Sequence, residues 1–239
     1  MNTIKILVHF TQYCEYYFQA RGIYSWGLTK FITIGKLPMV MNNDTKTRLV
    51  DATLAAIEEN KGCKGVSLRG IAKAAGCSHV NAYHYADGLD GLYWLAYIEA
   101  LRAFTAQALA GVAAPLPGRN FGEAAAGGIV AFALEHEGLY RLIWFEDLSG
   151  EPPEAVRADI ALASAAYRAE VAKALSEEGA GTDSLAADEA ADYFFAYLQG
   201  ELSLLINGRL GPDRGVATAE VLARCRTVWT ILAHARIAR

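Results

Sequence analysis

The feature that most constrains the fold is a proline-free stretch with helical spacing, between Pro38 and Pro115. One stripe of side chains within it follows the pattern i, i+3, i+4, i+7 and i+8, which marks one face of a helix. This stripe consists of Leu49, Ala52, Thr53, Ala56 and Ile57. Comparable stripes run from residue 121 to the end, and no segment alternates convincingly with a period of two. The 239-residue sequence therefore predicts an all-α protein.

Glycines, prolines and capping side chains predict the helix boundaries. The first helix begins near residue 45 and ends before Gly62. Ser67 is placed to cap a short second helix, and Ser78 to cap a short third helix that reaches Tyr85. Further helical segments are expected over about 89–112, 121–132, 139–143, 153–178, 186–207 and 216–237.

Composition narrows the class of protein. With 53% hydrophobic and 20% charged residues, the chain is neither a disordered tail, nor a collagen-like fibre, nor a basic protein that coats nucleic acid. Its four cysteines are far apart and form no C-x-x-C pair, as expected of reduced thiols. No apolar run reaches the roughly 18 residues of a membrane span. We therefore expect a globular, cytoplasmic protein with no membrane partner.

The charges are distributed unevenly along the chain. Residues 44–86 carry six basic and four acidic groups, a net charge of +2, whereas residues 87–239 carry twelve basic and twenty-one acidic groups, a net charge of −9. A mildly basic front on an acidic body suits a small module that binds a polyanion. Ordinary charge scatter is the alternative interpretation, because +2 over 43 residues is small.

The two short helices form the pattern of a DNA-binding helix-turn-helix, because a longer helix precedes them and Gly76 lies at the turn between them. Most side chains that follow the cap at Ser78 are polar or aromatic. A plain helical hairpin in an all-α core is the alternative. Such a polar run over 78–85 would be unusual for a core helix, and this favours DNA binding.

Residues 46–95 resemble the N-terminal domain of the TetR family of transcriptional regulators. Residues 66–72, VSLRGIA, match the second helix of that domain. Residues 75–78, AGCS, and 83–85, YHY, match its turn and its recognition helix, with the correct spacing throughout. The resemblance implies a three-helix DNA-binding domain over 42–88, followed by a helical effector-binding and dimerisation domain over 89–239.

By this resemblance, the two short helices carry the DNA contacts. Ser67 and the amides at its helix N-terminus would meet a phosphate, and Arg69 would read a base, with guanine suited to a bidentate contact. Asn81 would pair with adenine or with a phosphate. The side chains expected to face the floor of the major groove are His79, Val80, Asn81 and His84. The side chains expected to contact the phosphate backbone are Tyr83 and Tyr85, and the further DNA-contacting candidates are Lys46, Lys73 and Ser78. For each of these residues, a solvated surface position is the alternative.

Two positions depart from the family pattern. Ala86 stands where the family has an aromatic residue, and Leu89 stands where it has a lysine that touches phosphate. We expect looser packing under the recognition helix and one backbone contact fewer, and hence weaker DNA binding. Residues 1–41 lie outside the family architecture and are interpreted as an extension, with Met39 or Met41 as an alternative start. A genuine arm or an extra helix is the other interpretation.

The later part of the chain resembles the ligand-binding half of TetR members of the WHG type, over 132–142 and 197–202, with Gln199-Gly200 where that type has His-Gly. A pocket for a small-molecule effector is what the family implies. The candidate lining residues are aromatic: Tyr140, Trp144, Phe145, Tyr167, Phe194 and Tyr197. Each of them, taken singly, also fits a place in the core. The last two helices, 186–207 and 216–237, carry more apolar surface than one core needs, which predicts a homodimer.

No catalytic, metal-binding or cofactor site is expected. His136-Glu137 begins an H-E-x-x-H pattern, but Tyr140 stands where its second histidine would be. No G-x-S-x-G, Walker-type or G-x-G-x-x-G sequence occurs. We interpret the nearby acids Glu146, Asp147 and Glu151 as a solvated face.

The sequence thus predicts a repressor that binds a pseudo-palindromic operator as a homodimer and is released by an effector. An all-α ligand-binding protein or enzyme with a non-functional DNA-binding head is the alternative. A helical adaptor without DNA binding is a third possibility, but it would leave the polar 78–85 face unexplained.

Overall fold

The computed structural model describes residues 45–113, 120–178 and 187–234. Within these ranges the chain contains helices and no strand, which confirms the predicted all-α class. The predicted extension over 1–41 lies outside the described residues. The helices are α2 (Thr45–Asn60), α3 (Leu68–Ala74), α4 (His79–Ala82), α5 (Gly88–Ala113), α6 (Phe121–Glu135), α7 (Glu137–Trp144), α8 (Glu154–Glu177), α9 (Ala187–Ile206) and α10 (Arg214–His234).

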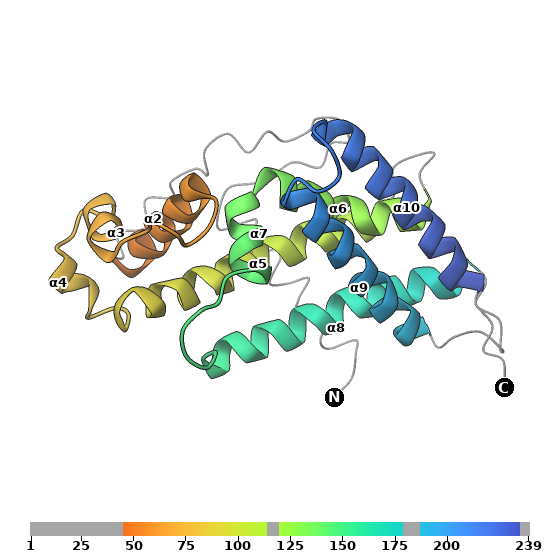
Figure 1. Cartoon of the computed structure of the whole chain (residues 1–239). Helices are drawn as coiled ribbons and strands as arrows, with labels where there is room; N and C mark the ends of the chain where they lie inside the picture. Colours follow the sequence, from red (N-terminus) through yellow and green to blue (C-terminus); the bar gives the residue numbers. More distant parts are fainter. Residues whose placement is uncertain (1–44, 114–119, 179–186, 235–239) are drawn as a thin grey trace, which may run out of the picture.

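The described helices form a small head and a larger body (Figure 1). The head consists of α2, α3 and α4, and the body consists of α6 to α10, while α5 begins under the head and runs on into the body. The head has its own small core, which consists of Leu49, Ile71, Ala72, Ala75, Ala82 and Leu92. A separate core of this kind allows the head to present a surface of its own.

Helix α2 belongs to both units because it buries two faces. Leu49 packs into the core of the head, whereas Val50, Leu54 and Ile57 pack into the core of the body. The body core is dominated by large side chains that solvent does not reach, among them Trp229, Tyr140, Phe132 and Phe194. The C-terminal end of α2 is therefore anchored to the body, and the short helices α3 and α4 lie beyond it (Figure 1).

The predicted caps of both short helices are present. The hydroxyl oxygen of Ser67 accepts a hydrogen bond from the backbone N–H of Gly70 at 3.2 Å. The hydroxyl oxygen of Ser78 accepts one from the backbone N–H of Asn81 at 3.1 Å. Each bond satisfies an amide that would otherwise lack a partner in the first turn of its helix.

The third helix is shorter than the sequence predicts. As an α-helix it ends at Ala82, and residues 83–85 continue as a tighter turn. In this turn the N–H of His84 donates to the carbonyl of Asn81, and the N–H of Tyr85 donates to the carbonyl of Ala82. These bonds span three residues instead of four, so the chain continues to turn through Tyr85 although the α-helix has ended.

Candidate nucleic-acid interface

The outer surface of the head carries the side chains that the sequence assigns to DNA. Ala82 is buried in the core of the head and fixes one side of α4. The opposite side is open, since Val80 is 61% exposed and Tyr83 is 59% exposed. His79, His84 and Tyr85 are exposed as well. A group of aromatic and aliphatic side chains that is exposed to water is often part of a binding surface.

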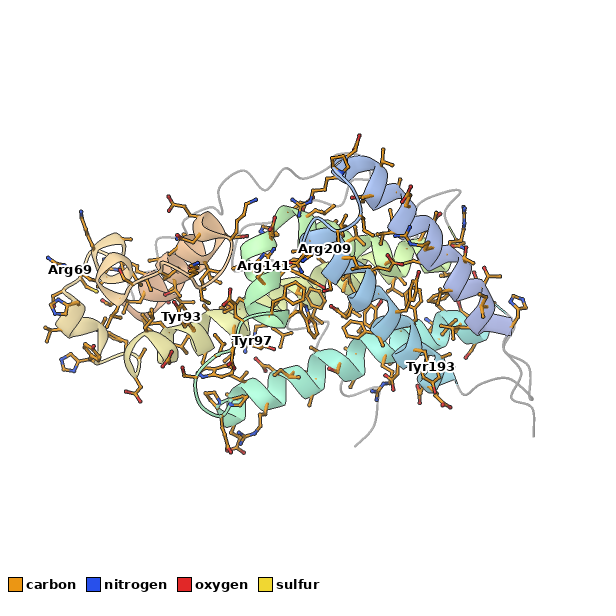
Figure 2. All side chains as sticks on the ribbon, viewed as in Figure 1. Arg69, Tyr93, Tyr97, Arg141, Tyr193 and Arg209 are labelled. Atoms are coloured by element: carbon orange, nitrogen blue, oxygen red, sulfur yellow. The ribbon has the colours of Figure 1, made fainter. Side chains whose placement is uncertain are left out.

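The cationic candidates also lie on the surface. Arg69 and Lys73 are exposed on α3, and Figure 2 shows Arg69 at the outer end of the head. Lys46 is exposed in the first turn of α2. Asn81 is half-buried, and its backbone N–H is bonded to the Ser78 hydroxyl. The two serine hydroxyls accept capping bonds, and each keeps its own O–H as a donor that a phosphate oxygen could accept.

One cation beside the turn was missed by the sequence analysis. A Cβ built on Gly76 would lie 3.8 Å from Nη1 of Arg48, so this guanidinium lies beside the turn between α3 and α4. Arg48 is exposed on α2, where its Nη2 donates to the Thr45 hydroxyl at 3.1 Å. No local spacing rule predicts this placement, because it depends on how α2 packs against a turn that lies 28 residues later.

The head is joined to the body by contacts at both ends of α7. At the start of α7, the Glu58 carboxylate accepts a hydrogen bond from the N–H of Gly138 at 3.1 Å, and its other oxygen lies 2.6 Å from Nδ1 of His136. After the end of α7, Oε1 of Glu146 accepts a bond from the N–H of Cys63 at 3.0 Å. Burial, with the Glu146 charge nearby, raises the pKa of the Cys63 thiol to about 12. A movement of α7 would therefore be transmitted to the head at two points.

Glu137, the first residue of α7, is held by three cations. Its carboxylate contacts Nζ of Lys61 at 3.4 Å, Nε of Arg141 at 3.2 Å and Nη2 of Arg214 at 3.1 Å. Burial alone would raise the pKa of Glu137, but the bonds from Arg214 and Arg141 and the charge of Lys61 together lower it. The His-Glu pair singled out in the sequence thus makes inter-helix contacts. Among the described residues, no three His, Cys, Asp or Glu side chains are grouped so as to hold a metal ion.

The six aromatic ligand candidates do not form one cluster. Tyr140 and Trp144 on α7 and Phe145 directly after it lie together, with Tyr140 buried and the other two 37% and 38% exposed. Tyr167 is buried on α8. Phe194 instead packs edge-on against Trp229 of α10, with ring centroids 5.1 Å apart.

The sixth candidate, Tyr197, is connected to α10. Its hydroxyl donates to Oε1 of Glu201 at 2.6 Å, and Glu201 is paired with Arg224 of α10. Both candidates on α9 are therefore linked to α10, Phe194 directly and Tyr197 through Glu201.

Two further residues connect the aromatic groups. The ring of Phe195 lies 5.6 Å from Trp144 and 5.5 Å from Tyr167, so it bridges α7 and α8. Oε1 of Gln199 accepts a hydrogen bond from the Tyr140 hydroxyl at 2.6 Å, while its buried Nε2 has no hydrogen-bond partner among the residues that the structure describes. Both Phe194 and Phe195 lie in a helix that is apolar nearly all round, so the sequence does not show which of them faces α7 and α8. The packing of α9 shows that it is Phe195.

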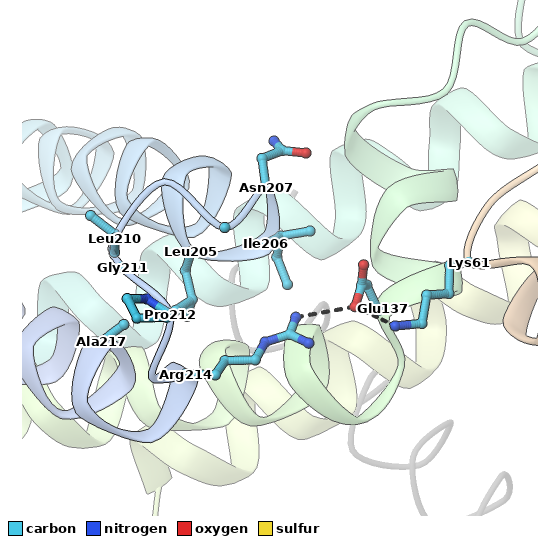
Figure 3. A pocket seen from close by; sticks show the side chains of 11 residues that line it. Lys61, Glu137, Leu205, Ile206, Asn207, Leu210, Gly211, Pro212, Arg214 and Ala217 are labelled. Atoms are coloured by element: carbon cyan, nitrogen blue, oxygen red, sulfur yellow. Dashed lines mark hydrogen bonds and ion pairs between the residues drawn. The ribbon is translucent and has the colours of Figure 1, made fainter.

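A pocket lies at the junction of head and body, and none of the six aromatic candidates lines it (Figure 3). Its volume is about 380 Å³, and it is lined by Lys61, Glu137, Leu205, Ile206, Asn207, Gly208, Leu210, Gly211, Pro212, Arg214 and Ala217. A smaller hollow of about 50 Å³ lies between α5 and α8 and is bordered by Arg102 and Asp159. Within the described ranges, no helix is both long enough and apolar enough to cross a bilayer.

The sequence matches no protein-family model and no curated protein. Solved structures do match. A protein of unknown function from Rhodococcus sp. RHA1 is 24% identical, with a TM-score of 0.66 over 82% of this chain and 100% of that one. A TetR-family transcriptional regulator from Streptomyces coelicolor is 19% identical, with a TM-score of 0.58 over 80% and 82%. The multidrug binding protein EbrR, complexed with imidazole, is 22% identical, with a TM-score of 0.50 over 76% and 94%. The chain therefore has the fold of TetR-family transcriptional regulators.

Proposed function

We propose that this protein is a DNA-binding transcriptional regulator of the TetR type. The observation that carries this proposal is the outer face of α4 and of the turn that follows it. Val80 on the helix and Tyr83 in the turn are exposed there, while Ser78 caps the helix and Ala82 anchors it. The cation Arg69 lies on the adjoining helix. A helix-turn-helix places its second helix in the major groove in this way.

The exposed residues divide into three roles. Val80, on the open side of α4, would lie against a thymine methyl group, and Arg69 would pair with a guanine. Tyr83 and Tyr85 end in hydroxyls that would donate to phosphate oxygens, which positions the head without reading sequence. Arg48, beside the turn, adds a third kind of contact, a long-range attraction to the phosphate backbone.

We propose that two copies of the chain pair through α9 and α10. Each of these helices leaves a stripe of apolar or small side chains uncovered along its outer side. On α9 the stripe consists of Tyr193, Ala196, Gly200 and Leu204, and on α10 it consists of Val216, Ala219, Thr227 and Ile231. Small residues let two helix pairs approach closely, and a second copy would cover the larger apolar groups. A pair of heads would then bind a pseudo-palindromic operator in the cytoplasm and repress transcription.

Effector release is proposed to act through α7. This helix carries Tyr140 and Trp144 on the side of the aromatic residues, and its two ends are bonded to the head through Gly138 and Glu146. A small molecule that inserts among the aromatic rings would displace α7 and thereby shift the head. This changes the spacing of the two heads and weakens the complex with DNA.

The experiment that tests the proposal is selection of bound sites from random DNA duplexes by the full-length protein at a stated salt concentration. We expect an inverted repeat to be enriched. Arg69→Ala should weaken binding to that repeat by about 10- to 100-fold and relax the preference at one base position. Arg168→Ala is the matched control, because Arg168 is also an exposed arginine but lies on α8 of the body.

Two results would overturn the proposal. One is a failure to enrich any repeat. The other is an equal effect of Arg168→Ala and Arg69→Ala. Either result would favour a helical ligand-binding protein whose head does not bind DNA.

A further inference from the structure

The pocket at the junction of head and body is built from three separate parts of the chain. Lys61 comes from the turn after α2, Glu137 from the start of α7, and the remaining residues from the end of α9, the turn 207–213 and the start of α10. Figure 3 shows Lys61 and Arg214 reaching toward the Glu137 carboxylate from opposite sides. Anything bound here touches the head and the body at once.

Positive charge exceeds negative charge in this pocket. Two cations, Lys61 and Arg214, line it together with one acid, Glu137. The acid is also neutralised by Arg141. Glu137 contacts one nitrogen of each lining cation, whereas an ammonium group has three N–H donors and a guanidinium group has five. The pocket can therefore offer charge-assisted hydrogen bonds to one additional anionic group.

The backbone at the start of α10 does not provide this binding. Oδ1 of Asp213 accepts hydrogen bonds from the N–H groups of Gly215 at 2.9 Å and Val216 at 3.0 Å. The Asp213 carboxylate thus already occupies the N-terminal amides of α10. Recognition of an anion depends on the side chains of Lys61 and Arg214.

The other walls of the pocket are mostly apolar. Leu205, Ile206 and Ala217 are buried, whereas Leu210 and Pro212, in the turn 207–213, still reach solvent. An inorganic anion would leave Leu210 and Pro212 in contact with water, whereas a molecule with an apolar part would cover them. The volume of about 380 Å³ suits a molecule of one ring or a short chain.

We propose that this junction pocket binds a small organic monoanion, a carboxylate that bridges Lys61 and Arg214 while its apolar part covers Leu210 and Pro212. Because the bridge joins head to body, its occupancy alters the position of the head. This second step rests on the DNA binding proposed above, whereas the binding of the carboxylate does not. The pocket is separate from the aromatic residues of α7 and α8.

Binding is tested on the full-length protein, without DNA, by calorimetric titration with benzoate, cyclohexanecarboxylate and octanoate. The neutral amide of each acid has nearly the same shape and serves as its control. We expect at least one acid to bind about tenfold or more tightly than its amide, because a charge-assisted bond is lost in the amide. Inorganic phosphate should bind more weakly than that acid. No binding of any acid at millimolar concentration would overturn the proposal, and so would equal binding of acid and amide.

Variants locate the site. Lys61→Gln and Arg214→Gln should each weaken binding of the acid about tenfold, and Arg214→Lys should retain much of it. Arg209→Gln is the matched control, because Arg209 is an exposed arginine of the same turn that does not line the pocket (Figure 2). An equal loss in Arg209→Gln would show that the acid binds elsewhere. Circular dichroism establishes that each variant is folded.

The regulatory step is tested with the selected operator. The binding acid should change the affinity of the wild-type protein for DNA at constant ionic strength, and its amide should not. Arg214→Gln should remove this response. If the acid binds in the pocket but the affinity for DNA does not change, the proposed regulation is wrong, whereas the proposed binding site is still supported. If the protein binds no operator, the proposed function fails while the titration still decides the site.

Discussion

Gly138, in the first turn of α7, lies directly against the carbonyl oxygen of Ile57 in the last turn of α2. Only a hydrogen atom fits on the α-carbon at this point, because a Cβ would overlap both that oxygen and the α-carbon of Glu58. The backbone of the head thus rests on the backbone of the body, and the Glu58 carboxylate closes the contact by accepting the N–H of Gly138. Backbone atoms on both sides leave little freedom for adjustment.

Gly138→Ala is therefore expected to push α2 and α7 apart. We expect the free energy of unfolding to fall by about 1–2 kcal/mol. This value is the penalty for overpacking, reduced by the better helix propensity of alanine. The DNA affinity should change as well, because the head shifts. The measurements are urea unfolding and fluorescence anisotropy with the selected operator.

Gly122→Ala is the matched control. Gly122 also lies in the first turn of a helix, α6, and a Cβ there would overlap Trp229 within the body. This variant should lose stability to a similar extent and keep its DNA affinity within about twofold, since it leaves the junction untouched. An equal loss of DNA affinity in both variants would contradict a specific role of the junction.

A second prediction separates capping from DNA contact at Ser78. Ser78→Ala removes the acceptor for the N–H of Asn81 and should lower the free energy of unfolding by about 1 kcal/mol. Ser78→Asp keeps a capping oxygen and should restore this stability. Its negative charge would repel the phosphate backbone, so we expect its DNA affinity to be lower than that of the alanine variant. Anisotropy titrations at two salt concentrations distinguish these outcomes, and an aspartate variant that binds DNA like the wild type would place Ser78 away from the phosphates.

The head shows which parts of this structure can be predicted from sequence. The capping bonds that Ser67 accepts from Gly70 and that Ser78 accepts from Asn81 span three residues, so a local sequence pattern reveals them. The contact between Glu58 and Gly138 joins residues that are 80 positions apart. No spacing rule reaches that far, and the junction pocket was accordingly missed.

The aromatic residues of α9 show a second limit. Residue type marked Phe194 as a candidate for ligand binding, yet its ring packs on Trp229 of α10. Its neighbour Phe195 faces Trp144 and Tyr167 instead. A helix that is apolar nearly all round gives no indication of which side meets which partner, because that choice is made by the packing of three other helices.

A third prediction concerns the ion pair between the buried Glu201 and the partly exposed Arg224. Two bonds of 2.8 Å join the carboxylate to the guanidinium. They lower the pKa of Glu201 below its ordinary value of 4.5, although burial opposes this. A carboxylate with a lowered pKa stabilises the fold at pH values above its unfolded-state pKa. That contribution is lost as the pH falls through the folded-state pKa.

Arg224→Met leaves the Glu201 carboxylate buried without this partner. At pH 7 the free energy of unfolding should fall by about 1–2 kcal/mol, because solvent already screens part of this pair and the Tyr197 hydroxyl still donates to Glu201. The difference from the wild type should narrow between pH 5 and pH 3, because protonation of Glu201 removes the unpaired charge. Urea unfolding at several pH values and one protein concentration measures this. Glu220→Gln removes only an exposed contact of Arg224 and should change stability by less than about 0.5 kcal/mol. A difference that does not depend on pH would contradict the role given to the pair.

The last prediction tests the proposed pairing through α9 and α10. Leu204 is 44% exposed and Ile231 is 61% exposed, each on the outer side of its helix. In a dimer that covers them, Leu204→Glu or Ile231→Glu would bury a carboxylate, so the dimer affinity should fall by about 100-fold or more. Light scattering coupled to size-exclusion chromatography should then show a single-chain mass at concentrations where the wild type is a dimer.

Ala161→Glu provides the control, because it adds the same charge to an exposed position of α8, outside the proposed interface. It should leave the mass unchanged. Loss of the dimer should also weaken operator binding, since one head contacts only one half-site of an inverted repeat. If Leu204→Glu and Ile231→Glu both remain dimeric, the chains pair through another surface, and the spacing of the heads must be set by contacts other than these two helices.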